Sequence, residues 1–358
     1  MKLVIVFLVL FALYCCDGAR ILVLAPFGTL SHKLVYMPLM EALAEKGHSI
    51  TVVSSFVAKK KVENIREVFV RSVEVEDVDF FLIRKFQFTA GIIPRLWITG
   101  DIISSVYDNL LDNQEFRQLQ SNEQFDLVVV VALFNDFCLS IADLWKVPIV
   151  TISPSVGPPW ILNNMGVPHH LASNPTVYTD YDNRMTFSQR LANTLELIVL
   201  TAARNALIIN PLNSKLRRDF SEIRTIQEVE KNISLCIVVS HPTLNYPRPL
   251  PPTVIEVTGL HIKPPKPLPL ELQMFADGSG EDGFIVFTLG SQIKCSTIPA
   301  ATVRSFVRAF SQIPQRVIWK WETDEKPPNL SPNVLTVKWL PQGDLLGKRH
   351  SSQFYRSV

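Results

Sequence analysis

The sequence is poor in the motifs that mark several common kinds of functional site. It has five cysteines among 358 residues and contains no C-x-x-C pair, no H-E-x-x-H motif and no aspartate-rich metal loop. These absences argue against a disulfide framework and against a metal cluster. The net charge is only +2 and no basic stripe with interleaved aromatics is present, so nucleic acid is not an expected partner. With 47% hydrophobic and 19% charged residues, the composition is typical of folded domains.

The N-terminus carries an apolar run in MKLVIVFLVLFALYCCDGAR. Lys2 precedes the apolar residues 3–14, and small residues lie just before Gly18. This order predicts a secretory signal peptide over residues 1–18, which would place the chain in the endoplasmic reticulum lumen or elsewhere in the secretory pathway. Asn232 begins an N-I-S sequon that could be glycosylated there.

Cleavage near residue 18 would remove two of the cysteines, Cys15 and Cys16, and leave three. Cys138, Cys236 and Cys295 are far apart in the chain, and each lies in an apolar run. We therefore expect them to be buried as small hydrophobic side chains, outside any disulfide or metal site.

Short apolar segments alternate with helical patterns along residues 19–241. The predicted strands are RILVLAP, SITVVSS, FDLVVVVALF, VPIVTIS and LCIVVSH, and helices are expected after the first strand and around 102–109, 136–145 and 187–200. Pro38 in the first helix predicts a kink or an irregular first turn. Strands that are apolar throughout are typical of parallel sheets covered on both faces. We therefore predict a doubly wound α/β domain over residues 19–241.

Nine prolines between Pro242 and Pro269 predict an extended linker over residues 242–269. The α/β pattern then resumes with GFIVFTLGS, a helix at 302–310, RVIWKWE and NVLTVKWLP. About three strands fit into residues 270–347, whereas doubly wound domains usually have more, so a partial domain is expected and a complete small domain is the alternative. Residues 348–358, KRHSSQFYRSV, follow no periodic pattern and are expected to form an atypical tail.

Two loops would lie at the carboxyl ends of predicted strands, where open α/β sheets bind ligands. APFGTLSHKL places His32 at a helix start, where the helix dipole favours the neutral imidazole that a general base requires. The residues equally allow His32 simply to cap the helix or to bond to nearby groups. FTLGSQIKCS offers Gly290 for close backbone approach and Ser291 as a hydroxyl and N–H donor, or it is a simple turn.

Five segments in this order resemble the UDP-glycosyltransferases, in particular the animal glucuronosyltransferase-like branch of invertebrate type: RILVLAPFGTLSHKLVYMPLMEALAEKGHSITVVS, NPTVYTDYDNRMTFSQRLANT, GFIVFTLGSQ, RVIWKWE and VLTVKWLPQGDLLG. The resemblance covers residues 1–347. It implies two facing Rossmann-like domains of glycosyltransferase B type, the second incomplete. The N-terminal domain would bind a small lipophilic acceptor and the C-terminal domain a UDP-sugar co-substrate, with no cofactor and no metal ion.

The resemblance also implies catalytic roles for single residues. His32 matches the base that removes the acceptor's hydroxyl proton during inverting transfer of a hexosyl or glucuronosyl group. Val131 stands where many relatives carry the acid that orients this histidine. Asp136, five residues later, is therefore the candidate acid, and its alternative role is that of a helix N-cap.

On the donor side, Ser291 matches the family's phosphate-contacting turn, next to Gly290. Trp339 resembles the residue that stacks on uracil, and Gln342 resembles its polar neighbour, because an aromatic face beside an amide suits a flat, hydrogen-bonding base. The alternative for Trp339 is that it packs inside the domain. Lys320 matches a basic residue near the donor.

In the family, WLPQGDLLG is followed by further donor-binding segments, a transmembrane helix and a basic tail, and residues 348–358 resemble none of them. Two hypotheses about function stay open. The chain transfers sugar from a UDP donor, or it is an inactive isoform that acts as a lumenal binding or regulatory partner, in homo- or hetero-oligomers with full-length relatives. An incomplete gene model is a third explanation of this ending.

Overall fold

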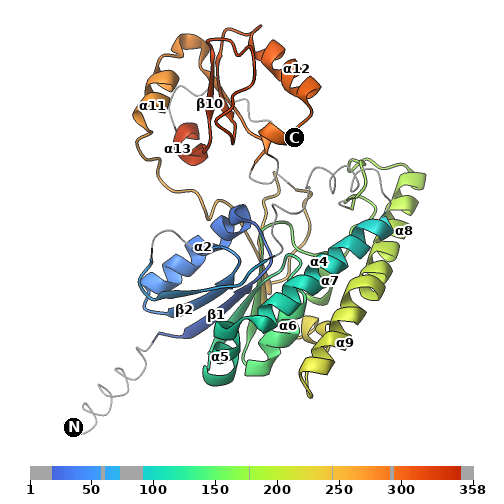
Figure 1. Cartoon of the computed structure of the whole chain (residues 1–358). Coiled ribbons are helices and arrows are strands. Elements are labelled where there is room, and N and C mark those ends of the chain that lie inside the picture. The colour runs from blue at the N-terminus through green and yellow to red at the C-terminus, as the bar shows by residue number, and fades with distance from the viewer. Residues whose placement is uncertain are drawn as a thin grey trace, which may run out of the picture. The chain divides into compact units, whose positions relative to one another are not determined.

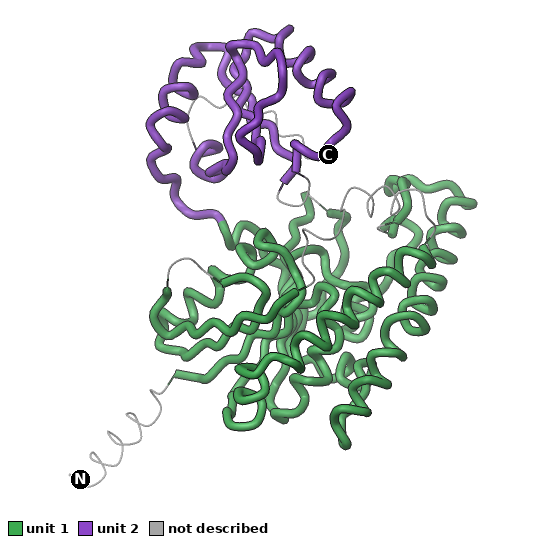
Figure 2. Tube along the Cα trace, in the orientation of Figure 1, with its two compact units in different colours: residues 1–77, 86–261 green, residues 78–85, 262–358 purple. Residues whose placement is uncertain are grey.

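The computed structural model describes residues 18–57, 61–72, 92–176, 178–243, 245–290 and 294–347 (Figure 1). The chain divides into two compact units (Figure 2): unit 1 comprises residues 1–77 and 86–261, and unit 2 comprises residues 78–85 and 262–358. The predicted signal peptide up to residue 17, the tail 348–358 and Ser291 lie outside the described residues.

Unit 1 is built on a seven-stranded parallel sheet of order β3-β2-β1-β4-β5-β6-β7. Its strands are β1 Arg20–Ala25, β2 Ser49–Ser54, β3 Ile65–Phe69, β4 Leu127–Val131, β5 Ile149–Ser153, β6 Leu235–Val239 and β7 Val254–Val257. The strand order reverses direction between β1 and β4, and ligands bind doubly wound sheets at the carboxyl ends of the strands at such a point. The five strands predicted in this region are confirmed.

The sequence did not predict β3 and β7, the two edge strands. β7 lies inside the stretch 242–269 that was expected to be a linker, and it pairs with β6 through Cys236 and Val254. Prolines flank this strand, and an edge strand tolerates them because one side of it donates no ladder hydrogen bonds. The boundary between the units consequently falls after His261.

Helices cover both faces of the sheet. Helix α2, Leu30–Glu45, buries Tyr36 and Met40 against one face. It includes Pro38 without interruption, and Leu34, whose carbonyl loses its donor there, is half exposed to water. The other face is covered by α4 Ile92–Asp112, α5 Gln114–Asn122, α6 Phe137–Ala142, α7 Pro159–Asn164, α8 Phe187–Arg204, α9 Asn210–Asp219 and α10 Ile226–Glu230.

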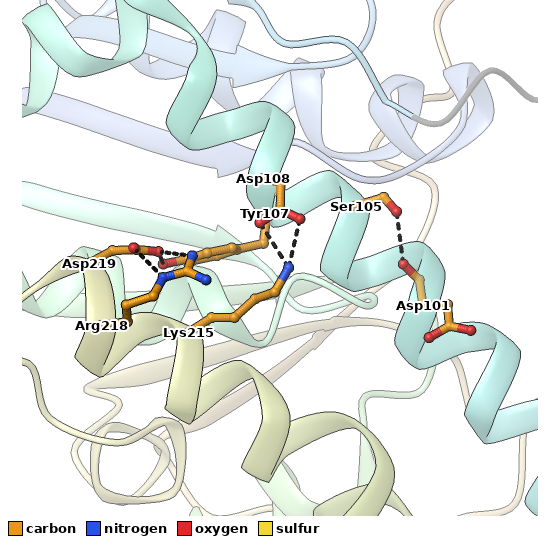
Figure 3. A network of polar contacts seen from close by, with 7 residues as sticks. All are labelled: Asp101, Ser105, Tyr107, Asp108, Lys215, Arg218 and Asp219. Carbon is orange, nitrogen blue, oxygen red and sulfur yellow. Dashed lines mark hydrogen bonds and ion pairs between the residues drawn. The ribbon is translucent and has the colours of Figure 1, made fainter.

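Polar contacts fasten α4 to α9 (Figure 3). The buried Tyr107 donates its hydroxyl hydrogen to Asp219 Oδ2 at 2.7 Å, and Lys215 Nζ pairs with Asp108 Oδ2 at 2.6 Å. Burial raises the pKa of Tyr107, so its hydroxyl remains a donor. These contacts hold α9, and with it the end of α8, against the rest of the helical layer.

The helical stretch Phe187–Asp219 is long and apolar enough to cross a membrane by length and composition alone. Core helices of folded domains pass the same test, and Leu197 and Leu200 of this stretch pack into the core of unit 1. The stretch also supplies residues to the pocket described below.

Unit 2 contains a three-stranded parallel sheet of order β10-β9-β8. The strands are β8 Phe284–Phe287, β9 Arg316–Lys320 and β10 Val334–Val337, and the helices are α11 Leu270–Asp277, α12 Ala300–Phe310 and α13 Gln342–Leu346. One apolar cluster joins α11 and α13 to the sheet, and a second joins α12 to it. Both units are therefore α/β layers on parallel sheets, as predicted.

The three cysteines in the described residues are buried, as expected. Cys138, Cys236 and Cys295 are free and buried, and their burial raises the pKa of each thiol. They are packed as small apolar side chains.

Candidate functional site

His32 lies in the first turn of α2, beyond the carboxyl end of β1. It forms a capping box with Thr29: Thr29 Oγ1 accepts from the His32 backbone N–H at 3.4 Å, and His32 Nδ1 accepts from the Thr29 backbone N–H at 3.1 Å. Burial lowers the pKa of His32, so the ring is neutral at pH 7. A neutral imidazole that accepts at Nδ1 carries its proton on Nε2.

The hollow around His32 is small and mostly apolar. Val131, at the position where the resemblance leads us to expect an acid, lines it together with Leu133 and Ser55. Ser55 Oγ is buried and has no hydrogen-bond partner in the described part of the chain. The neighbouring Lys33 is neutralised by an ion pair with Glu67. The hollow therefore favours an uncharged imidazole.

Asp136 follows β4 and occupies the N-cap position of α6, but its side chain makes no capping hydrogen bond. Instead, its Oδ1 accepts from Arg204 Nη2 at 2.6 Å, and the same nitrogen contacts Glu230 Oε1 at 2.6 Å. A buried guanidinium requires such anionic partners. Among the hydrogen bonds of the described residues, none joins Asp136 to His32, so the expected contact is replaced by the pairing with Arg204.

Asn135 fixes the loop that carries Asp136. Its fully buried side chain accepts from Phe27 N at 2.9 Å and donates to Phe27 O, Val131 O and Leu133 O, each at 3.0 Å. Phe134 adopts the left-handed region with φ of 56°, which ordinary side chains rarely occupy. The amide thus ties the loop after β4 to the loop after β1, on the two sides of the point where the strand order reverses.

A pocket of about 290 Å³ opens beside this loop, within unit 1. Its wall is mostly apolar and includes Asp136, Arg204 and Trp160 as polar or amphipathic members. The guanidinium carbon of Arg204 lies 4.0 Å from the ring centre of Trp160. Leu133 lines both this pocket and the hollow at His32. An apolar cavity with few polar groups is typical of small-molecule sites.

In unit 2, four of the predicted donor-binding residues lie at the carboxyl ends of the three strands or just beyond them. Gly290 follows β8 with φ of 83°, and its carbonyl accepts from Lys320 Nζ at 2.9 Å. Trp339 is 62% exposed, so it does not pack inside the unit. Gln342 begins α13. Ser291 is outside the described residues.

Asn232 is exposed after α10, and its amide donates to Glu228 O at 2.8 Å. Within the described ranges, no three His, Cys, Asp or Glu side chains are grouped so that they could hold a metal ion.

The family model described as UDP-glucoronosyl and UDP-glucosyl transferase matches residues 19–355. The chain belongs to this family. UDP-glycosyltransferase UGT5 of Dactylopius coccus is 33% identical over 338 residues, covering 91% of this chain and 63% of that protein. UDP-glucuronosyltransferase 2B7 of Homo sapiens is 26% identical over 342 residues, covering 90% of this chain and 64% of that protein. The chain thus spans less than two thirds of the length of these relatives.

Solved structures agree with this UDP-glycosyltransferase assignment at the level of the fold. The calicheamicin glycosyltransferase CalG4 matches with a TM-score of 0.53 and 16% identity, covering 94% of this chain and 73% of that one. Medicago truncatula UGT71G1, complexed with UDP-glucose, matches with a TM-score of 0.51 and 11% identity, covering 94% of this chain and 74% of that one. The predicted glycosyltransferase B fold is confirmed.

The sequence did not indicate three residues of this candidate site: Asn135, Trp160 and Arg204. Asn135 could have been noticed as a polar residue directly after an apolar strand. Arg204 lies 68 residues from Asp136, and nothing local to its helix indicates that partner.

Proposed function

We propose that this chain transfers a hexosyl or glucuronosyl group, with inversion, from a UDP-sugar to a hydroxyl of a small lipophilic acceptor. Family membership is the observation that carries the proposal. In this reaction the acceptor oxygen attacks the anomeric carbon, the bond from that carbon to the diphosphate breaks, UDP leaves, and the hydroxyl proton passes to His32. The apolar pocket of unit 1 supports a lipophilic acceptor.

The neutral state of His32 and its place beyond β1 support its role as the base. Its hydrogen bond sets one condition. A base acting through Nε2 needs that nitrogen unprotonated, whereas the contact from Thr29 N to Nδ1 holds the proton on Nε2. Turnover therefore requires the ring to leave the capping box, or its proton to move to Nδ1.

For the donor, the exposed face of Trp339 supports stacking on uracil, with Gln342 as its polar neighbour. Gly290, Ser291 and Lys320 are the residues proposed to contact the diphosphate. No cofactor and no metal ion is part of this proposal.

The test is a transfer assay on the full chain with UDP-glucose or UDP-glucuronate and 2-naphthol, with the glycoside and UDP measured together. We expect both products, and we expect His32→Ala to lower kcat by about 10²–10⁴-fold. His241→Ala, which alters an exposed histidine, is the control and should leave the rate unchanged. Full turnover by His32→Ala would contradict the base assignment.

A second candidate function is non-catalytic binding, as a partner of a catalytic relative. The observation that favours it is that His32 Nδ1 is engaged by Thr29 while the Asp136 carboxylate is engaged by Arg204. Acceptor binding without glycoside formation from either donor, at any pH between 6 and 9, would favour this function over transfer.

We also propose that the chain resides in the endoplasmic reticulum lumen and is glycosylated at Asn232, whose exposure supports access to the side chain. Expression in insect cells followed by peptide N-glycosidase should then give a mass decrease, and Asn232→Gln should abolish it. An unmodified wild-type chain would contradict this part of the proposal.

A further inference from the structure

The wall of the unit 1 pocket contains the carboxylate of Asp136, which does not serve as a helix cap. Asp136 lies at the N-cap position of α6 but makes no capping bond, and it lines the pocket. Among the described residues, its Oδ1 accepts a hydrogen bond from Arg204, and no partner of its Oδ2 is found there. A carboxylate oxygen in a mostly apolar cavity is an acceptor that a bound molecule can satisfy.

Asp136 is held by a buried cluster. Arg204 and Glu230 are almost fully buried, and the guanidinium packs on Trp160 at 4.0 Å. One positive charge therefore faces two carboxylates, and burial raises the pKa of Glu230. Glu230 does not line the pocket, whereas Asp136 and Arg204 do. The ion pair with Arg204 therefore holds the Asp136 carboxylate in place as a hydrogen-bond acceptor. The guanidinium of Arg204 is itself already bonded to Asp136 and Glu230.

Trp160 adds a donor to the same wall. Its Nε1 is buried and has no hydrogen-bond partner among the described residues. The second guanidinium on the wall, Arg248, already donates to Val156 O, and burial lowers its pKa. A hydroxyl group can both donate to a carboxylate and accept from an indole, and an ether oxygen can only accept.

We infer that Asp136 accepts a hydrogen bond from a donor group of a molecule bound in this pocket, and that it thereby selects molecules that carry such a donor over otherwise identical molecules that lack one. The inference rests on the proposed function in taking the pocket as the acceptor site. It replaces the expected role of Asp136 as the partner of His32 with direct recognition of the ligand.

The test measures binding without any UDP-sugar, so it does not depend on transfer. The probes are 2-naphthol and its methyl ether, 2-methoxynaphthalene, titrated into the full chain by calorimetry. The wild type should bind the naphthol about tenfold or more tightly than the ether, because a hydrogen bond to a charged group is lost with the ether.

Two variants provide a matched pair, because each removes one carboxylate charge from the same arginine. Asp136→Asn should reduce the preference for naphthol to about twofold or less. Glu230→Gln should keep the preference near its wild-type value. Unchanged affinity for the ether would show that the pocket remains folded in both variants.

Any of three results would overturn the inference. The wild type shows no preference for naphthol over the ether, the Asp136→Asn variant keeps this preference, or both variants lose it to the same extent. Failure of the transfer assay with the binding preference intact would instead contradict the proposed function alone.

Discussion

The two units fix their loops at opposite edges of their sheets. In unit 1, Asn135 lies beyond the carboxyl end of β4 and binds one amide and three carbonyls there. In unit 2, Asn333 makes a similar set of contacts, donating to Phe310 O, Ile313 O and Gln315 O, but it precedes β10 and so lies at the amino edge. Since α/β sheets bind ligands at the carboxyl edge, only unit 1 has its amide clamp at the ligand side.

The side chains of the two carboxyl edges differ in the same way. In unit 1, Asp136 and Arg204 are largely buried and mutually bonded before any ligand arrives. In unit 2, Trp339 is 62% exposed, and Lys320 donates to Gly290 O at 2.9 Å and pairs with Glu322 Oε1 at 3.0 Å. Unit 1 thus presents a preformed pocket, whereas the edge of unit 2 leaves an aromatic face for a ligand to cover.

The largest expected effect on stability comes from removing Arg204 from its buried cluster with Asp136 and Glu230. Arg204→Met should lower the free energy of unfolding by about 3–5 kcal/mol, because Asp136 and Glu230 would stay buried without their cation. Urea denaturation monitored by circular dichroism measures it. Arg66→Met, which removes ion pairs of an arginine side chain that is 46% exposed, is the control and should cost about 1 kcal/mol or less. Equal losses in the two variants would contradict the importance of burial.

The next effect compares the two amide clamps directly. Asn135→Ala should destabilise the chain by about 2–4 kcal/mol, because the Phe27 N–H and three carbonyls lose their partners in a fully buried place. Asn333→Ala should cost about 1–2 kcal/mol, since its site is half-buried and water can replace part of the amide. Asn135→Ala should also weaken 2-naphthol binding, and Asn333→Ala should not. A larger decrease in the free energy of unfolding for Asn333→Ala than for Asn135→Ala would contradict this prediction.

Most of the fold followed from the sequence, because continuous apolar runs such as those of β1, β4 and β9 read as strands of a covered parallel sheet. The edge strands β3 and β7 did not, since their burial is intermittent and prolines surround β7. An edge strand forms because it pairs with its neighbour in the sheet, here β3 with β2 and β7 with β6. The sequence of the strand itself does not indicate this pairing.

The candidate site was only partly predictable for a related reason. The positions of His32 and Trp339 after predicted strands follow from strand order and turn composition. The pairing of Asp136 does not, because Arg204, which also binds Glu230, reaches it from a helix far along the chain. A capping role for His32 was one of the alternatives that the residues allowed, and the structure contains this capping box.

The exposed tryptophan of unit 2 provides a smaller test. Trp339→Ala should weaken UDP binding by about tenfold, because stacking of an aromatic side chain on a base contributes about 1–3 kcal/mol. The stability of the chain should change by less than about 0.5 kcal/mol, since the side chain is mostly exposed. Trp97→Ala in unit 1 removes a tryptophan that is 60% exposed and should leave UDP binding unchanged. Calorimetry with UDP distinguishes these outcomes, and an equal loss in both variants would contradict the stacking role.

The smallest effect is a dependence of stability on pH that belongs to unit 1. All histidines between residues 19 and 347 lie in that unit, and burial lowers the pKa of His32 and of His169. An unfolded histidine binds its proton near pH 6.5, and these folded ones bind it only at lower pH. The unfolded state therefore holds more protons as the pH falls below about 6.5, and the free energy of unfolding decreases.

His32→Gln should reduce this acid sensitivity and leave the start of α2 intact, because glutamine at the third helical position can complete the capping box with Thr29. The measurement compares urea midpoints at pH 7.5 and pH 5.0. His261→Gln, at an exposed position of the same unit, should keep the wild-type difference. An unchanged pH dependence in His32→Gln would show that the imidazole of His32 does not contribute to the acid sensitivity, and the comparison between the units would then rest on Asn135 and Arg204 alone.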